Sequence, residues 1–287
     1  MNVISCMPLA NMLSWEPGQV CDTFRSIGYD AIEVTLPFLH LDQGDNAYAE
    51  RALKAIGDSG LQVSEVAIAL DYVRLDEDIR KEQINRAVEL VRFLAGNGIK
   101  NAMMFSGPLP GLRESLVVGR DIPVGTAWKY FFEALDTILP VAEQCGMRIG
   151  IENVWGMVCD TFYANMFMLS HYQSDFLGVN LDVSHDMLYG ITDVAFIIRQ
   201  YGSKIFHAHI KDAVGVPEVG KFAFPMLGEG IVNWNDYFDT MREIGYTGAY
   251  SIECEAWNFL ESQLDGKYEK AAELSYQAFW KLYQKKQ

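Results

Sequence analysis

Four side chains that could bind a metal ion stand at the ends of consecutive apolar segments in the second half of the sequence. Each is the polar residue that closes one segment: Glu152, Asp182, His209 and Glu253. Three carboxylates and one imidazole offer mostly oxygen and partly nitrogen ligands, which suit Mn²⁺, Co²⁺, Mg²⁺ or Zn²⁺ and differ from the sulfur-rich ligands of structural zinc sites. Because one divalent ion would offset most of the repulsion among the carboxylates, we predict a site for one divalent metal ion.

Each of these residues also has a structural interpretation. A single carboxylate at a strand end is more often a helix N-cap or a salt-bridge partner, but four on consecutive segments favour a metal site. Alternate residues of a strand share a face, so His207 competes with His209 and Glu255 competes with Glu253. We prefer His209 as the ligand and assign His207 to the core or to the surroundings of the ligands. Glu253 is preferred to Glu255 because the apolar segment runs directly into it.

A second group of residues could contact a substrate. His185 follows Asp182 by three residues and could instead cap the next helix, while Glu33 and Glu65 could either reach a substrate or form buried structural pairs. Four aromatic residues near predicted strand ends could wall a sugar pocket or simply pack: Trp15, Phe105, Trp155 and Trp257. The residues that we predict to bind substrate are His185, Glu65, Trp15, Trp155 and Lys211.

The chain as a whole alternates short β-rich segments with longer segments of helical period, which is typical of parallel strands joined by crossover helices. The eight expected strands are 3–6, 31–35, 62–68, 100–105, 148–153, 178–182, 205–210 and 249–253. Eight units predict a closed (β/α)8 TIM barrel in a single domain, 1–287, with an open doubly wound sheet as the alternative. No G-x-G-x-x-G follows the first strand, which disfavours the dinucleotide-binding version of that alternative. In a barrel, the carboxyl ends of the strands meet at the active-site face, where the four candidate ligands would gather.

Glycine marks the ends of the helices between these strands. The segment 78–94 has apolar residues at helical spacing before a Gly-Asn-Gly stop, and a further helix is expected over 125–145. Five glycines stand between a helix end and a strand start, as in repeated β/α units: Gly28, Gly60, Gly98, Gly146 and Gly245. The connection 212–230, which contains several Gly and Pro residues, could be a mobile loop over the pocket or simply a long connection.

The composition disfavours several classes of protein. The 287 residues are 50% hydrophobic and 21% charged, which fits a globular protein with a large core. With 23 Lys+Arg against 38 Asp+Glu, the net charge of −15 disfavours nonspecific binding to nucleic acid or to an anionic membrane. The five cysteines include no C-x-x-C pair and indicate neither a disulfide framework nor a cysteine zinc site. Without a basic leader or a long apolar run, the sequence predicts a soluble cytoplasmic protein.

Five short motifs carry a resemblance to a known family. They are Gly150-Ile-Glu-Asn-Val-Trp, Asn180-Leu-Asp-Val-Ser-His, His207-Ala-His-Ile-Lys-Asp, Leu227-Gly-Glu-Gly-Ile-Val-Asn-Trp and Gly248-Ala-Tyr-Ser-Ile-Glu. Over nearly the whole chain, the sequence resembles the sugar phosphate isomerase/epimerase group of xylose isomerase-like barrels, which includes ketose 3-epimerases such as D-tagatose 3-epimerase. The resemblance implies that the four candidate ligands bind a single divalent metal ion, that His185 contacts the substrate, and that the chain is able to form homo-oligomers.

The resemblance also implies an isomerase of carbohydrate metabolism that acts on a small-molecule sugar or sugar phosphate. In the first hypothesis the protein epimerises C3 of a ketose through an enediolate, and the catalytic residues Glu152 and Glu253 remove and return a proton on opposite faces. The second hypothesis keeps the metal but changes the reaction to aldose–ketose isomerisation or keto-inositol dehydration. Two positions depart from the 3-epimerases, since Val158 stands where they have Glu and Gly215 where they have Arg.

Two further hypotheses lie outside this chemistry. Apurinic endonucleases belong to the same superfamily, but they need a histidine-rich cluster of several zinc ions and a basic surface, whereas this chain has five histidines and a net charge of −15. A noncatalytic sugar-binding or partner-binding barrel would bind its ligand without hydrogen exchange. The sequence contains neither a P-loop nor a clear arginine cluster and leaves open whether the sugar is phosphorylated.

Overall fold

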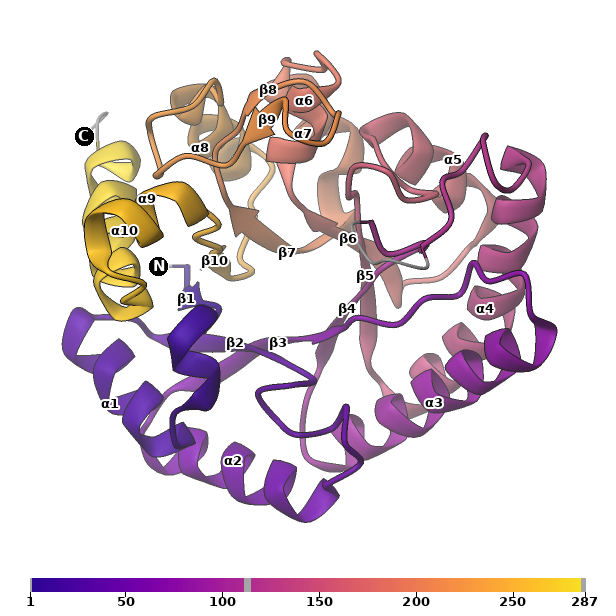
Figure 1. Cartoon of the computed structure of the whole chain (residues 1–287), viewed down its shortest axis with the longest axis horizontal. Helices are drawn as coiled ribbons and strands as arrows, with labels where there is room; N and C mark the ends of the chain where they lie inside the picture. The colour runs from indigo at the N-terminus through magenta and orange to yellow at the C-terminus, as the bar shows by residue number, and fades with distance from the viewer. Residues whose placement is uncertain (1, 111–114, 285–287) are drawn as a thin grey trace.

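Eight parallel strands form the centre of the molecule in a computed structural model that describes residues 2–110 and 115–284. They close into a barrel in the order β1-β10-β7-β6-β5-β4-β3-β2 (Figure 1). The strands are β1 (Ile4–Cys6), β2 (Ala31–Thr35), β3 (Gln62–Ile68), β4 (Asn101–Met104), β5 (Arg148–Glu152), β6 (Leu177–Leu181), β7 (Ile205–Ile210) and β10 (Tyr250–Ile252). The predicted (β/α)8 barrel is therefore confirmed, and the sheet is closed rather than open.

Helices cover the outside of this barrel (Figure 1). They are α1 (Pro17–Ile27), α2 (Asn46–Asp58), α3 (Glu77–Gly96), α4 (Val124–Cys145), α5 (Phe162–His171), α6 (Val183–Leu188), α7 (Val194–Tyr201), α8 (Trp234–Glu243), α9 (Trp257–Leu264) and α10 (Tyr268–Tyr283), with the 3₁₀ turns η1 (Ala10–Ser14) and η2 (Gly202–Lys204). Several helices end at a glycine in the left-handed conformation, such as Gly28 after α1 and Gly146 after α4. Among the described residues, no helix has the length and apolar character needed to cross a membrane.

Polar side chains gather inside the barrel, although most strand residues are apolar and buried. Those that are at most 1% exposed include Glu33, Glu65, Asn180, His207 and His209. Buried polar groups usually have polar partners, and contacts of His207 with Asn180 and Glu65 and of His209 with Glu33 help to fix their positions. Two irregularities in strand pairing, at Ile32/Glu33 and at Val179/Asn180, lie directly beside them. Bulges of this kind often re-aim side chains next to active sites.

Two glycines allow the backbones of β5, β6 and β7 to approach closely beneath the site. A Cβ atom on Gly178 would collide with the carbonyl oxygen of Lys204 and with the ring of Phe206. A Cβ atom on Gly150 would lie 2.9 Å from the backbone nitrogen of Asn180. Glycine is therefore required sterically in this part of the barrel.

The connection 212–230 contains a short antiparallel hairpin of β8 (Val214–Gly215) and β9 (Phe222–Ala223) at the carboxyl end of the barrel strands. The buried carboxylate of Asp212 anchors its base, because it accepts hydrogen bonds from the backbone N–H groups of Gly228 (3.0 Å) and Val232 (3.1 Å) and from the indole of Trp234 (3.0 Å). The connection is thus a folded element with its own pairing rather than a plain loop.

Candidate metal centre

The four candidate ligands converge at the carboxyl ends of four neighbouring strands. Their ligand atoms all lie within 4.8 Å of one another. Glu152 is the last residue of β5, His209 lies within β7, and Asp182 and Glu253 directly follow β6 and β10. The His209 Nδ1 atom is 2.8 Å from Glu152 Oε1, 3.3 Å from Glu253 Oε2 and 4.0 Å from Asp182 Oδ2. The structure therefore brings together the four residues that the sequence singled out.

The helix N-cap interpretation is also correct at one of these positions. Asp182 caps α6, because its Oδ1 atom accepts a hydrogen bond from the backbone N–H of Ser184 at 2.9 Å. Its second oxygen, Oδ2, turns toward the quartet and lies 2.9 Å from Lys211 Nζ. The cap fixes the side chain's orientation and leaves one carboxylate oxygen for the site.

The far side of the His209 ring is held by a buried carboxylate. Its Nε2 atom lies 3.0 and 3.1 Å from the two oxygens of Glu33, which is fully buried. When Nε2–H donates to Glu33, the Nδ1 lone pair faces the quartet, as in the carboxylate–histidine–metal arrangements of many metalloproteins. Burial lowers the pKa of His209, but the charges of Glu33, Glu152 and Glu253 outweigh burial and raise it well above its usual value.

The ammonium group of Lys211 lies among the carboxylates of the site. Its Nζ atom is 2.9 Å from Asp182, 2.6 Å from Glu253 and 3.0 Å from Glu255. Burial acts to lower the pKa of Lys211, but these carboxylates raise it well above its usual range. Even with Lys211 protonated, carboxylates outnumber cationic groups here, so the donor set fits a divalent cation.

The two glutamates of the quartet occupy different electrostatic environments. Burial raises the pKa of Glu152 to about 7, although the neighbouring His209 acts in the opposite direction. Burial also acts to raise the pKa of Glu253, but Lys211 and His209 outweigh it and hold the pKa below its ordinary value. Paired carboxylates in contrasting environments are typical of acid–base sites.

A cavity of about 470 Å³ opens over the quartet and is lined by Glu152, Glu253 and Glu255. Among the predicted substrate-binding residues, His185, Trp155 and Lys211 line it, as do the aromatic candidates Phe105 and Trp257. The His185 Nδ1 atom accepts a hydrogen bond from the backbone N–H of Trp155 at 3.4 Å. Burial lowers the pKa of His185 to about 3, which leaves a neutral imidazole in the wall of the cavity.

The other two predicted substrate-binding residues lie elsewhere. Trp15 follows η1 and packs against the hydrophobic core. Glu65 lies deeper in the barrel, where its Oε2 atom is 3.1 Å from Nδ1 of His207. The His207 Nε2 atom is in turn 3.2 Å from Ser64 Oγ. This arrangement matches the buried pairing that the sequence left open for Glu65.

Sequence reasoning missed two aromatic residues of the cavity wall. Phe222 and Phe224, from β9 and the residues after it, line the cavity. The Phe222 ring packs edge-on against Trp155 with centroids 4.9 Å apart, and Lys211 Nζ lies 4.5 Å from the centroid of Phe224. The alternation in Phe222-Ala-Phe224 is too short to indicate a strand within a segment interpreted as a loop.

A family model and several known proteins are similar to this chain. A family model described as a xylose isomerase-like TIM barrel matches residues 21–278. The L-ribulose 3-epimerase of Mesorhizobium japonicum is 25% identical over 253 residues, which cover 85% of this chain and 77% of that protein. The protein MJ1311 of Methanocaldococcus jannaschii is 29% identical over 127 residues, a match that spans 42% of each chain.

Solved structures resemble this one over almost their whole length. The IOLI protein with a bound zinc atom has a TM-score of 0.77 at 18% identity and covers 99% of this chain and 98% of its own. The 3-keto-D-glucoside 4-epimerase of E. coli has a TM-score of 0.75 at 13% identity, covering 99% and 100%. A probable 3-DHS dehydratase of Bacillus anthracis has a TM-score of 0.73 at 16% identity, covering 98% and 99%. At these identities the likeness concerns the fold.

Proposed function

This chain belongs to the family of xylose isomerase-like TIM barrels, and we propose that it is a divalent-metal-dependent sugar epimerase or isomerase, with 3-epimerisation of a ketose as its specific reaction. The observation that carries the proposal is the convergence of Glu152, Asp182, His209 and Glu253 beneath one cavity. The 25% identity to an L-ribulose 3-epimerase over most of the chain supports the same reaction class.

The chemistry of the donor set supports a metal ion at this position. Glu152, Asp182, His209 and Glu253 would hold it, and Glu33 would orient His209 from behind. A divalent ion held by these residues would act as a Lewis acid that polarises a carbonyl group and acidifies the neighbouring C–H. Mn²⁺, Co²⁺, Mg²⁺ and Zn²⁺ all accept this set of oxygen and nitrogen ligands.

The positions of the two glutamates on separate strands support proton transfer from two sides. Glu152 belongs to β5 and Glu253 follows β10, and β6 and β7 separate these strands in the barrel. A sugar carbon between the two carboxylates would lose its proton to one and receive a proton from the other on its opposite face. This exchange inverts the centre and is balanced, because each carboxylate returns to its starting state after proton exchange with solvent.

Other residues of the cavity bind the sugar and exclude water. His185 and Lys211 present an imidazole and an ammonium group that can hydrogen-bond to hydroxyl groups. Trp155, Phe105 and Trp257 offer apolar surface to the C–H faces of the ring. Water exclusion by these aromatic residues strengthens the electrostatic interactions in the site.

Dehydration is the second candidate, because the ammonium of Lys211 lies 2.6 Å from Glu253 Oε2. A proton donor next to a base could protonate a departing hydroxyl group, which an epimerase does not require. Both candidates start with removal of a proton next to a carbonyl, so the products distinguish them.

A panel of ketoses incubated in D₂O with the protein and added Mn²⁺ tests the proposal. The protein and the metal are removed after the incubation, and proton NMR then shows where deuterium has entered each sugar. Deuterium at C3 together with the C3 epimer is the expected result. Deuterium at C1 or C2 would instead indicate aldose–ketose isomerisation, and a dehydrated product would indicate the second candidate. No exchange in any sugar would contradict both.

A further inference from the structure

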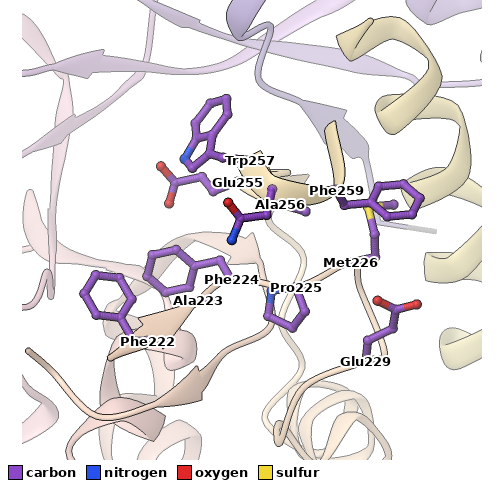
Figure 2. A pocket seen from close by; sticks show the side chains of 11 residues that line it. Phe222, Ala223, Phe224, Pro225, Met226, Glu229, Glu255, Ala256, Trp257 and Phe259 are labelled. Carbon is purple, nitrogen blue, oxygen red and sulfur yellow. The ribbon is translucent and has the colours of Figure 1, made fainter. Parts of the chain in front are cut away.

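A second cavity, of about 310 Å³, lies beside the cavity over the metal centre (Figure 2). It is bounded by the residues around β9 on one side and by the start of α9 on the other. Four residues line both cavities: Phe222, Phe224, Glu255 and Trp257. The two cavities therefore share a wall, and a ligand held over the metal centre can extend into the second cavity.

Direct contacts join the shared wall to the metal centre. The ring of Phe224 lies edge-on to His185, with centroids 5.3 Å apart. Glu255 accepts a hydrogen bond from the ammonium group of Lys211 at 3.0 Å, and the same ammonium group lies 2.6 Å from Glu253. The shared wall thus continues directly into the surroundings of the metal ligands.

Aromatic rings give the second cavity flat apolar surfaces. Figure 2 shows Trp257 facing the rings of Phe222 and Phe224 across the opening, and Phe259 belongs to the same lining. Trp257 is 43% exposed although it belongs to the wall of both cavities. Because the faces of a sugar ring carry C–H groups, stacking of such a ring on this indole would remove apolar surface from water.

Polar side chains accompany these rings in the lining of the second cavity. They are Glu229, Glu255 and Asn258. Glu229 and Asn258 are exposed, and neither side chain makes a hydrogen bond or an ion pair with another residue that the structure describes. Carboxylate and amide oxygens accept hydrogen bonds from hydroxyl groups. Apolar surfaces together with free acceptors match a sugar ring, whose faces are apolar and whose edge carries hydroxyl groups.

Charge and size restrict the occupant further. No Lys, Arg or His stands among the described residues that line the second cavity, so a phosphate group would meet the carboxylates Glu229 and Glu255 without a cation. The two cavities, of about 470 and 310 Å³, each reach the roughly 300 Å³ at which pockets for small molecules begin. Each cavity therefore offers room for one uncharged sugar ring.

We propose that the second cavity binds a second, uncharged sugar ring, and that the substrate is a disaccharide whose reducing-end ketose lies over the metal centre. This inference rests on the proposed function, because it places the reacting ketose beside Glu152 and Glu253. The second ring lies against the indole of Trp257, and its hydroxyl groups donate to Glu229 and Asn258. A monosaccharide leaves these groups in water, so the disaccharide binds more tightly.

The linkage between the two rings leaves the reacting atoms of the ketose free. Epimerisation at C3 needs a carbonyl group at C2 and a hydrogen on C3. A glycosidic bond to the oxygen of C4, C5 or C6 keeps both, because C2 is unsubstituted and the ketose ring still opens to its carbonyl form. The glycosyl group on the distal part of the ketose is therefore compatible with the proton transfer by the two glutamates.

Isothermal titration of the Mn²⁺-loaded protein with alditols tests the proposal. The disaccharide alditols are maltitol, cellobiitol and isomaltitol, which carry a glucosyl group on O4 or O6 of sorbitol, and sorbitol itself is the reference. At least one of the three should bind about tenfold more tightly than sorbitol, because its second ring is buried in the second cavity. These probes have no carbonyl group and cannot react, so the comparison is independent of turnover.

The same titration separates this inference from the proposed function. If the proposed function fails, no ketose of the panel exchanges deuterium at C3. If only this inference fails, ketoses exchange deuterium but the three disaccharide alditols bind no more tightly than sorbitol.

Two variants of the second cavity provide the internal check. Ala223 and Asn258 line the second cavity but not the first. Ala223→Phe fills the cavity and should reduce the preference for the disaccharide alditol to less than about threefold, while sorbitol binding stays unchanged. Asn258→Ala removes one exposed amide, so it should fold normally and lower the same preference. Val216 lies on the hairpin connection, is 49% exposed and lines neither cavity, so Val216→Phe is the matched control and should keep the wild-type preference.

Several results would overturn the proposal. They are equal binding of sorbitol and all three disaccharide alditols, no binding of any alditol at millimolar concentration, and a preference that survives both cavity variants. Tighter binding of sorbitol 6-phosphate than of every disaccharide alditol would also overturn it, because the site would then prefer an anionic substituent. If a second copy of the chain covered the cavity instead, sedimentation would show a dimer and the preference would be absent.

Discussion

Removal of the Lys211 ammonium should destabilise the metal-free protein and strengthen its response to metal. The Lys211→Met variant keeps most of the apolar stem but leaves Asp182, Glu253 and Glu255 without their cation at 2.9, 2.6 and 3.0 Å. Because the folded pKa of this lysine is raised above its unfolded value, its stabilising effect is fully present at neutral pH and is lost only at very alkaline pH.

The expected magnitude follows from the burial of this group. Breaking a buried ion pair by removing one partner costs about 3–5 kcal/mol. A domain of this size shifts its melting temperature by about 2 °C per kcal/mol, so Tm in EDTA should fall by about 6–10 °C. A divalent ion at about 100 times its Kd contributes about 2.7 kcal/mol by mass action in the wild type. This metal-dependent increase in stability should be larger in Lys211→Met, because no ammonium group competes with the ion for the same carboxylates.

Differential scanning calorimetry in EDTA and in excess Mn²⁺ measures both effects. The matched control is Lys129→Met, since Lys129 is 71% exposed and lies 3.7 Å from Glu133, and surface pairs of this kind contribute at most about 1 kcal/mol. Equal melting temperatures for wild type and Lys211→Met in EDTA would refute the reasoning. An equal increase in Tm on addition of Mn²⁺ to wild type and to Lys211→Met would refute the competition between the lysine and the metal.

Three further predictions concern the surroundings of the site. Burial raises the pKa of Asp186 from 3.8 to about 8, so folding stability should fall by about 1.4 kcal/mol per pH unit between these values. Asp186→Asn should remove this slope in urea unfolding at pH 5 and 7, and parallel pH profiles would contradict the assignment. Glu33→Gln should weaken Mn²⁺ binding about 10–100-fold in titration calorimetry, because His209 loses its buried carboxylate, and unchanged affinity would exclude this role. Gly178→Ala should cost about 1–3 kcal/mol or more in chemical denaturation through backbone collision, whereas Gly96→Ala, with open space around its Cβ position, should be neutral or slightly stabilising.

The barrel itself was predictable from local sequence signals. The predicted strands 31–35, 62–68 and 205–210 have the observed bounds, because short β-rich segments between turn signals are typical of strands. The predicted strands 178–182 and 249–253 extend one residue too far at their carboxyl ends. Asp182 and Glu253 directly follow β6 (Leu177–Leu181) and β10 (Tyr250–Ile252) instead of ending them.

The ligand quartet was predictable because parallel strands bring their carboxyl ends to one face, whatever the distance along the chain. The contacts that hold the ligands from inside the barrel were not predictable from the sequence. The proximity of Glu33 to His209 depends on closure of the barrel and on a strand irregularity beside Glu33, and neither leaves a local signal in the sequence. Sequence spacing alone could not separate substrate contact from buried pairing for Glu65, which meets His207 across the barrel.

The cavity wall required tertiary structure for a different reason. Phe222 and Phe224 are held over the site by a two-residue ladder and by the buried anchor Asp212. Pairing this short is below the length at which hydrophobic alternation is informative. Trp15 lies near a predicted strand end, but it packs against the core and is not among the residues that line the cavity.

Solvent deuterium exchange in the single variants Glu152→Gln and Glu253→Gln tests the central claim most directly. Each of two C3-epimeric ketoses is incubated with each variant in D₂O, at a Mn²⁺ concentration that keeps the site loaded. We expect that neither variant interconverts the epimers, and that each variant exchanges the C3 proton of a different epimer, because one glutamate remains on one face. Near-normal epimerisation by both variants, or exchange of the same epimer by both, would contradict proton transfer by two opposed glutamates.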